Sequence, residues 1–326
     1  MDGRGLSPDA GRYDRCVSVP RAHLGIPSRR PRFLLVSLGQ ELSATARRVV
    51  PRPVKAWLKQ VRVRYLRTVH AFGREDLERG LVEVGVAPGD ILMVHSSFDS
   101  FVGFRGAPAQ IVRALQDAVG PFGTILMPTL PFTESVVSYA ETEPLFDVQR
   151  TMSKMGLITE VFRRSAHVVR SLHPTHSVAA WGSKARELIA GHERAGTPCG
   201  RDTPWGRLLD YDAKVLLLGV PGRTMTFFHA LEEALEPELP IPVFEQAEYT
   251  LRYRDGEGVT RVAKTRLFSL RLARHRDPAP LWRELRRRRL LRQARVARLR
   301  LVLLRARDAF DVGLAMARGG VFCLKP

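Results

Sequence analysis

Short apolar runs alternate along the chain with longer amphipathic stretches, and this pattern predicts the secondary structure. Apolar runs bounded by turn residues predict buried strands at residues 91–94, 124–127 and 215–218. Helical periodicity predicts helices at residues 74–84 (closed by Gly85), 109–119, 154–164 and 224–236. A chain that alternates strands and helices in this way is typical of an α/β layered fold.

The remaining parts of the pattern are less regular. Two strands, at 249–253 and 258–263, are expected to form a hairpin around Asp255-Gly256. Alternation across 296–304 predicts one further strand, and residues 309–317 predict a closing helix. Residues 128–150 predict a long irregular segment, and loops of this length in compact domains are commonly functional.

Length and composition bound the domain organisation. The 326 residues suffice for one large domain or about two smaller ones. Residues 1–53 are rich in Arg and Pro and predict a basic N-terminal extension with the composition of a disordered segment. Residues 54–326, which open with a basic helix at 54–66, predict the folded domain, and residues 240–326 predict a smaller C-terminal subregion within it.

The apolar fraction of 44% is enough for a packed core. No run approaches the roughly 20 apolar residues that span a bilayer, so we expect no membrane span. The N-terminus has no secretory pattern. Cys16, Cys199 and Cys323 have no metal-ligand spacing and suit a reducing compartment. These features together predict a cytoplasmic protein.

A formal net charge of +19 has two interpretations. One is an anionic partner such as nucleic acid, a membrane surface or a phosphorylated cofactor. The other is a set of solvated arginine-rich faces with no partner, because charge runs usually face water. The excess is concentrated in residues 12–67 and 283–307.

The candidate chemistry is concentrated between residues 169 and 233, where histidines stand among Pro, Gly, Ser and Thr. On the predicted helix at 224–236, His229 and Glu232 are three residues apart and share a face. A histidine beside a carboxylate is what a general base requires. Singly, His173, His176, His192 and His229 are each more often satisfied structural histidines than catalytic ones.

Other motifs are absent or ambiguous. Ser96 and Ser97 follow a predicted strand, a place where α/β sheets bind ligands, although a simple serine-capped loop explains them as well. The chain has no P-loop, GxGxxG, HExxH or CxxC motif, and we expect no metal. It also lacks the Gly-x-Ser-x-Gly motif of a serine hydrolase.

Seven sequence blocks resemble the aminoglycoside N3-acetyltransferase family. They are VHSSF (94–98), MPT (127–129), RSLHPTHSVAAWG (170–182), GH (191–192), TPWGRL (203–208), VLLLGV (215–220) and TFFHALEE (226–233). The resemblance covers roughly three quarters of the chain, from about Arg74 onward. It implies that residues 54–326 form an acetyltransferase domain with the α/β fold peculiar to this family, unlike the Gcn5-related fold.

The resemblance also implies an activity. It is the transfer of an acetyl group from acetyl-coenzyme A to a small-molecule amine, without obligatory nucleic acid, and a homodimer is compatible with it. The family pattern T-x-x-H-x-A-E matches Thr226, His229 and Glu232, with Leu231 in place of the small residue. These three are the expected catalytic residues, with His229 as base.

The residues expected to bind the donor follow from the same resemblance, whereas the carboxylates expected to bind the acceptor are chosen because they make the loop at 128–150 locally acidic. Those implied for the donor are His95, Ser96, Ser97, Ser171 and His173. Those expected for the acceptor are Glu141, Glu143, Asp147 and His176.

One departure affects the acceptor. Members that act on aminoglycosides are expected to carry acidic residues after the hairpin, where this chain has Lys264, Arg266, Arg271 and Arg274. A less charged amine, such as an amino sugar, is therefore the expected acceptor, and antibiotic resistance is left open. Two alternatives remain: a basic protein that binds nucleic acid or a membrane surface on an inactive scaffold, and a hydrolase with Ser96 as nucleophile.

Overall fold

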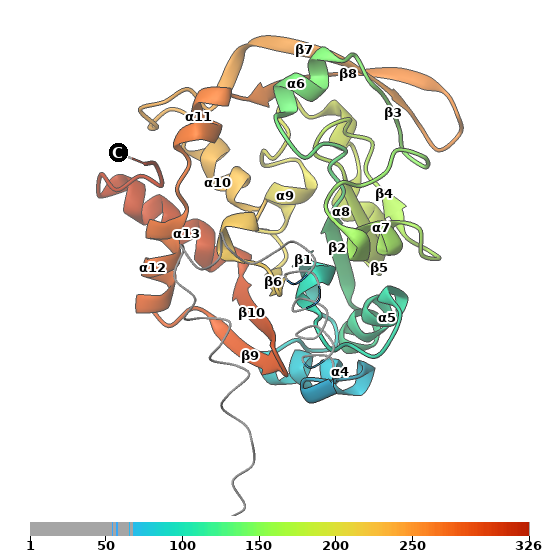
Figure 1. The fold of residues 1–326 in the computed structure, drawn as a ribbon. Helices are drawn as coiled ribbons and strands as arrows, with labels where there is room; N and C mark the ends of the chain where they lie inside the picture. The colour runs from blue at the N-terminus through green and yellow to red at the C-terminus, as the bar shows by residue number, and fades with distance from the viewer. Residues whose placement is uncertain (1–53, 55–56, 58–64, 66–67, 326) are drawn as a thin grey trace, which may run out of the picture. The chain divides into compact units, whose positions relative to one another are not determined.

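The computed structural model describes residues 54, 57, 65 and 68–325. Internal contacts divide the chain into Met1–Leu58 and Lys59–Pro326, and every element from α4 onward belongs to the second unit. The predicted extension at 1–53 and most of the predicted helix at 54–66 lie outside the described residues (Figure 1). The boundary at residue 53 and the subregion at 240–326 stay predictions.

A seven-stranded mixed sheet lies at the centre of the fold, in the order β4-β5-β2-β1-β6-β10-β9 (Figure 1). Its strands are β1 (Ile91–Ser96), β2 (Thr124–Pro128), β4 (Val169–Arg170), β5 (Val178–Gly182), β6 (Lys214–Leu218), β9 (Arg292–Val296) and β10 (Leu299–Arg305). β1 runs parallel to β2 and β6, and the outer strands pair antiparallel. The C-terminal ends of β1, β2 and β6 therefore share one edge, where open α/β sheets bind ligands.

Both faces of this sheet are buried, which explains why its central strands are continuously apolar. In β6, Val215 and Leu217 join one core and Leu216 and Leu218 join the other. The first core includes α8 (Ala185–Ile189), α9 (Pro204–Arg207), α10 (Phe228–Ala234), α12 (Ala279–Arg287) and α13 (Ala306–Arg318). The second includes α4 (Arg74–Val84), α5 (Pro108–Val119) and α7 (Leu157–Arg163).

A second sheet consists of β3 (Leu145–Asp147), β7 (Phe244–Arg254) and β8 (Thr260–Phe268), followed by α11 (Leu270–His275). The predicted hairpin around Asp255-Gly256 is confirmed as the β7–β8 ribbon (Figure 1). The stretch 128–150, predicted to be irregular, contains β3 and α6 (Val136–Glu141). Pairing with β7 forms β3, and the Ser135 side chain caps α6, so neither element follows from apolar periodicity.

Most predicted elements are confirmed to within a few residues, including the strands β1, β2 and β6 and the helices α4, α5 and α13. The strand predicted at 296–304 is confirmed as β10, but its predicted start is three residues too early and the hairpin with β9 was not predicted. Val296 pairs with Leu299 across a two-residue turn, in which Ala297 takes φ +52°, so β9 and β10 form a hairpin without a glycine signal. The predicted helix at 224–236 is also shorter, because the turn η3 (Gly222–Thr224) precedes α10.

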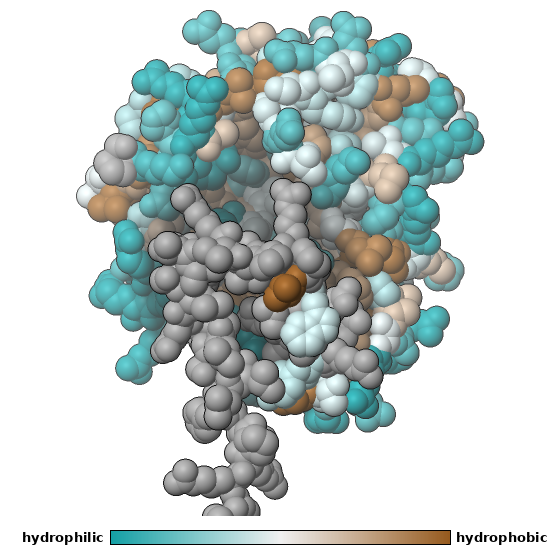
Figure 2. Space-filling view, viewed as in Figure 1, coloured by the Kyte–Doolittle hydropathy of each residue, from teal (hydrophilic) through white to brown (hydrophobic). Residues whose placement is uncertain are grey.

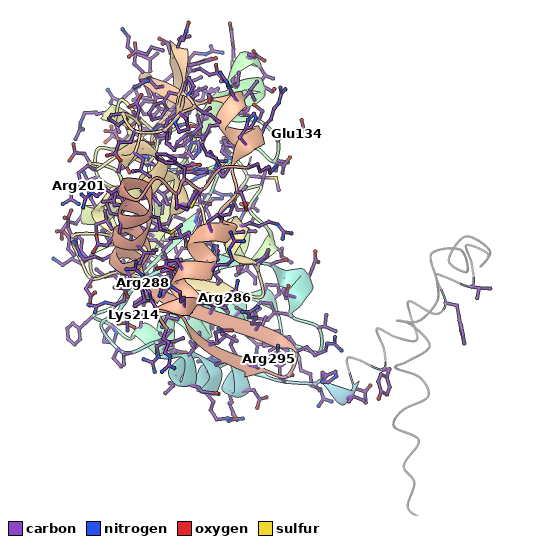
Figure 3. All side chains as sticks on the ribbon, turned by 90° about the vertical axis from the view of Figure 1, so that its left-hand side faces the viewer. Glu134, Arg201, Lys214, Arg286, Arg288 and Arg295 are labelled. Carbon is purple, nitrogen blue, oxygen red and sulfur yellow. The ribbon has the colours of Figure 1, made fainter. Side chains whose placement is uncertain are left out.

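The visible face of the described residues is mainly hydrophilic, with apolar side chains in small groups (Figure 2). The basic C-terminal run lies on α12, β9 and β10, and Figure 3 shows Arg286, Arg288 and Arg295 along these elements. One carboxylate, Glu284, pairs with Arg287 and Arg288. Within residues 68–325, no helix is long and apolar enough to cross a membrane.

Candidate functional site

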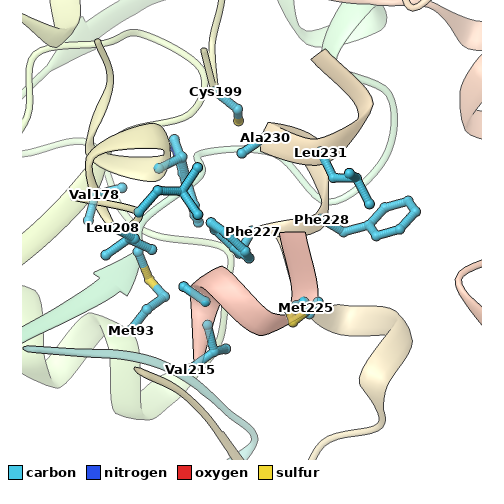
Figure 4. Packing of buried hydrophobic residues seen from close by; sticks show 14 of the residues in the cluster. Met93, Val178, Cys199, Leu208, Val215, Met225, Phe227, Phe228, Ala230 and Leu231 are labelled. Atoms are coloured by element: carbon cyan, nitrogen blue, oxygen red, sulfur yellow. The ribbon is translucent and has the colours of Figure 1, made fainter. Parts of the chain in front are cut away.

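The loop after β6 carries His229 to the edge shared by the parallel strands. At Gly219, which has φ +70°, a Cβ would lie 2.4 Å from the Cβ of Ser100, so a side chain is excluded. Phe227 and Phe228 follow and point to opposite sides (Figure 4). Both are buried in the first core. They fix the start of α10, whose second residue is His229.

The opposite face of α10 packs on α13. Leu231 lies against Gly313, where an added Cβ would stand 2.2 Å from Cδ2 of Leu231. This glycine is needed for the close approach of the two helices, since any side chain would displace Leu231. Glu232 follows Leu231 directly and bonds to His229. The packing of α10 on α13 therefore sets the positions of His229 and Glu232.

The predicted pairing of His229 with Glu232 is present. Nδ1 of His229 lies 2.7 Å from Oε2 of Glu232, and the Glu232 side chain is 4% exposed. A third group joins them: the guanidinium of Arg276 donates from Nε to Oε1 at 2.5 Å and from Nη2 to Oε2 at 2.8 Å. Arg276 follows α11 and lies among many other arginines in the sequence, which is why sequence reasoning missed it.

This arrangement determines the charge states. Although burial favours the neutral acid, hydrogen bonds from His229 and Arg276 lower the pKa of Glu232. Burial, reinforced by the positive charge of Arg276 and opposed by Glu232, lowers the pKa of His229 below 6.5. At neutral pH the pair is therefore a carboxylate beside an uncharged imidazole, which is able to accept a proton.

Three further histidines form a buried cluster that extends from His229. The ring of His176 meets that of His229 edge-on, with 6.0 Å between the ring centroids. The ring centroid of His173 lies 6.2 Å from that of His176 and 4.5 Å from that of His192. Burial lowers the pKa of His173 and His176 well below 6.5 and that of His192 to about 3. The cluster is therefore uncharged.

Hydroxyl and backbone groups form hydrogen bonds with the ring nitrogens of this histidine cluster. His192 lies 2.9 Å from both Ser171 Oγ and the Pro198 carbonyl. Thr175 Oγ1 lies between the rings, 2.9 Å from His176 Nδ1 and 3.3 Å from His173 Nδ1. Ser171 and His173, predicted to bind the donor, are thus part of the packed interior.

The end of β1 presents polar atoms without partners among the described residues. His95 Nε2 and Ser96 Oγ are buried and have no hydrogen-bond partner there. Burial, and after it the charge of His229, lowers the pKa of His95 to about 3. Ser97 begins the turn η1 (Phe98–Ser100), and its backbone N–H donates to Leu218 of β6. Unsatisfied buried polar atoms are costly, so this loop is suited to a ligand that supplies partners.

The acidic residues predicted for the acceptor are separated. Asp147 lies in β3 and accepts the backbone N–H groups of Gln149 and Arg150, so it stabilises its own turn. Glu141 and Glu143 are exposed at and after the end of α6. After burial, the charges of Glu245 and Glu141 raise the pKa of Tyr249, which places these groups near one another. Thr226 is partly exposed, and its carbonyl accepts the His229 N–H.

A cavity of about 800 Å³ lies beside β4, between α7, α8 and the hairpin tip at Gly256. Its lining includes Ser171 and four arginines: Arg163, Arg164, Arg170 and Arg186. Glu160 pairs with Arg163 and Arg164, whereas Arg170 donates to the carbonyls of Thr129 and Thr151 and stacks on Phe146. Glu193 also lines the cavity, but the arginines outnumber it, so the cavity is basic. No group of His, Cys, Asp and Glu within the described part of the chain is arranged to hold a metal ion.

Comparison with known proteins connects this geometry to a family. Residues 93–318 match the model for aminoglycoside 3-N-acetyltransferases. Aminoglycoside N(3)-acetyltransferase VII of Streptomyces paromomycinus is 32% identical over 172 residues, which are 49% of this chain and 59% of that protein. Aminoglycoside N(3)-acetyltransferase III of Serratia marcescens is 31% identical over 199 residues, 57% of this chain and 72% of that protein. The matched segment therefore spans less than two thirds of the first relative.

Solved structures give the same result for the fold. Aminoglycoside acetyltransferase AAC(3)-Xa superposes with a TM-score of 0.68 at 25% identity, covering 81% of this chain and 99% of that one. AAC-IIIb in a binary complex with CoASH gives 0.64 at 25% identity, over 78% and 99% of the two chains. AAC-VIa bound to sisomicin gives 0.65 at 25%, over 77% and 99%. The predicted α/β fold of this family, distinct from the Gcn5-related fold, is confirmed.

Proposed function

Because the chain belongs to the aminoglycoside 3-N-acetyltransferase family, we propose that it moves an acetyl group from acetyl-coenzyme A to an amine of an aminoglycoside or amino-sugar-like acceptor. The observation that carries this proposal is the hydrogen bond between His229 Nδ1 and Glu232 at the ligand-binding edge of the sheet. The bound coenzyme would supply an activated acetyl thioester. Its complex with AAC-IIIb supports this choice of donor.

His229 acts as the general base. Glu232 accepts a hydrogen bond from the Nδ1–H group of His229. The other ring nitrogen, Nε2, is then unprotonated and can take a proton from the acceptor amine. This step is required because amines are mostly protonated at neutral pH. The carboxylate also stabilises the imidazolium that forms. Thr226, at the turn before α10, is the proposed hydrogen-bond donor to charge that develops on the thioester oxygen.

Two features support a fit to the donor. The unpaired Ser96 Oγ and His95 Nε2 lie at the end of β1 and would gain partners from the bound acyl donor. The basic cavity beside Ser171 has the sign of charge that the phosphate groups of the coenzyme require. We assign the thioester end to the β1 loop with Ser97, and the phosphates to this cavity. The buried His173 would support the donor site from behind without facing the coenzyme.

The acceptor side is walled by aromatic rings and has a mixed charge. The ring centroid of Phe268 lies 4.5 Å from that of His229, and the ring centroid of Phe132 lies 5.7 Å from that of His176. Arg266 is paired with Glu236, while Glu141 and Glu245 lie near Tyr249. An acceptor with few positive charges fits this surface better than a strong polycation. Comparable turnover of tobramycin-like drugs and simple amino sugars would contradict this choice.

The test is release of free thiol from acetyl-coenzyme A across aminoglycosides, amino sugars and arylamines, with a no-amine control. We expect amine-dependent release in the wild type. Release without amine would identify a hydrolase that uses Ser96. No release, together with steeply salt-dependent DNA or anionic-vesicle binding, would identify the basic surface of α12 and β9 as the functional part instead (Figure 3).

A further inference from the structure

Arg276 binds both oxygens of the Glu232 carboxylate, and one of these, Oε2, is the oxygen that also binds His229. We propose that Arg276 is a positioning residue that fixes the proton arrangement of His229, and that the backbone at Cys323–Lys325 holds Arg276 in place. The proposal rests on the proposed role of His229 as base, and it concerns a residue 44 positions further along the chain.

The carboxylate has two ways to bind the imidazole, and only one leaves a competent base. If Glu232 is ionised, it accepts the proton of Nδ1 and Nε2 keeps its lone pair. If Glu232 is protonated, its O–H donates to Nδ1, and the imidazole proton then sits on Nε2, where it blocks proton transfer. Since Glu232 is 3% exposed, burial alone would favour the second arrangement. The double hydrogen bond from Arg276 selects the first.

Arg276 is itself held by strand-like pairing with the C-terminal segment. Its backbone forms an antiparallel bridge with Leu324. On either side, the Asp277 N–H donates to the Cys323 carbonyl at 2.8 Å and the Lys325 N–H donates to the His275 carbonyl at 2.6 Å. The backbone of Arg276 also closes α11 by donating to Leu272. These bonds fix the direction from which the guanidinium reaches Glu232.

Other titratable groups approach the pair from every neighbouring element. They are His95 in β1, His176 before β5, Cys199 before α9, Glu233 on α10 and Cys323 in the C-terminal segment. Burial keeps the two histidines and the two cysteines uncharged near pH 7, because it lowers the pKa of the histidines and raises the pKa of the thiols. None of these groups carries a positive charge near pH 7. The permanent positive charge beside Glu232 is therefore that of Arg276.

The experiment replaces Arg276 with Gln or Lys and uses Arg274→Gln as a matched control. Arg274 is exposed on α11, two residues before Arg276, so its loss removes an equal charge without touching Glu232. Two readouts are taken: kcat/KM against pH, and the tautomer and titration of the His229 imidazole by nitrogen-15 NMR without substrate. The NMR readout does not depend on activity.

We expect Arg276→Gln to lower kcat/KM at pH 7 roughly tenfold to a hundredfold, as loss of a hydrogen-bonded support for an active-site ligand commonly does. Arg276 lowers the pKa of both His229 and Glu232, so without it the pair takes up its proton at higher pH and the acid limb should move to higher pH. In this protonated pair the arrangement with Glu232 protonated and the imidazole proton on Nε2 should appear. Arg276→Lys should restore part of the effect. Lys325→Pro, which removes one backbone donor, should shift the profile in the same direction by less.

An unchanged pH profile and tautomer in Arg276→Gln, with an active wild type, would overturn this inference and leave the proposed function standing. If the wild type releases no thiol with any amine, the proposed function fails, while the NMR tautomer still tests Arg276. A variant that is only destabilised would lose melting temperature without a change of tautomer, and that result also counts against the proposal.

Discussion

His229 and His192 are the same residue type in two different surroundings, and the comparison explains why one is a candidate base and the other is structural. His192 is fully buried, and its two ring nitrogens bind a hydroxyl and a backbone carbonyl. His229 has a side chain 17% exposed and a carboxylate held by an arginine. Burial lowers the pKa of both. The group that opposes this shift is a neutral backbone carbonyl at His192 and a carboxylate at His229, and the full charge of the carboxylate stabilises the imidazolium.

The largest expected effect is loss of transfer in His229→Ala. Removing the base should lower kcat by about 10²- to 10⁴-fold. Coenzyme A binding, measured by calorimetry, should stay within a few-fold of wild type, because the donor contacts proposed above lie elsewhere. Near-normal turnover by this variant would show that His229 is not the base.

The matched change in the buried cluster, His192→Ala, should act on stability instead. It removes the imidazole partner of the Pro198 carbonyl and one of the partners of Ser171 Oγ, which still accepts the Val178 N–H, and it opens a cavity. Such changes cost roughly 2–4 kcal/mol. Denaturant unfolding measures this loss. The kcat of the folded fraction should stay within a few-fold of wild type, and a loss as large as that of His229→Ala would erase the distinction.

The pH profile sharpens the comparison further. Since burial and Arg276 lower the pKa of His229, the acid limb of kcat/KM should have its midpoint below pH 6.5. Below that midpoint the imidazole is protonated, so the rate should fall about tenfold per pH unit. The log of kcat/KM between pH 4.5 and 8.5 tests this, and a midpoint above 7 would contradict it.

The smallest effect is expected at Glu233, beside the site. Burial raises the pKa of this carboxyl to about 7, against hydrogen bonds from Thr197 and the Cys199 N–H. A raised pKa in the folded state means that Glu233 favours folding below pH 4.5 and loses that contribution as pH rises through 7. Glu233→Gln keeps an acceptor for Cys199, so it should raise the free energy of unfolding at pH 8 by about 1–2 kcal/mol and leave it unchanged at pH 4.5. Equal changes at both pH values would refute the assignment.

The sequence predicted the parts of the fold that depend on local patterns. The apolar runs of β1, β2 and β6 located the parallel centre of the sheet, and the spacing of His229 and Glu232 predicted their hydrogen bond. Family resemblance is the source of the proposed activity. The hairpin at Ala297 was missed because its left-handed turn lacks glycine or asparagine. Arg276 was missed because its role comes from tertiary pairing with Leu324, which no local pattern records.

The close contact of Leu231 with Gly313 has a consequence for the order of synthesis. The helix that carries His229 leaves the ribosome before α13, on which it packs, and before the segment that holds Arg276. A nascent chain that ends shortly after His229 therefore still lacks α13, which positions α10, and Arg276, which orients His229 through Glu232. Chains released early, or cut by a protease before α13, should accordingly be inert even though they retain every residue of the seven family blocks.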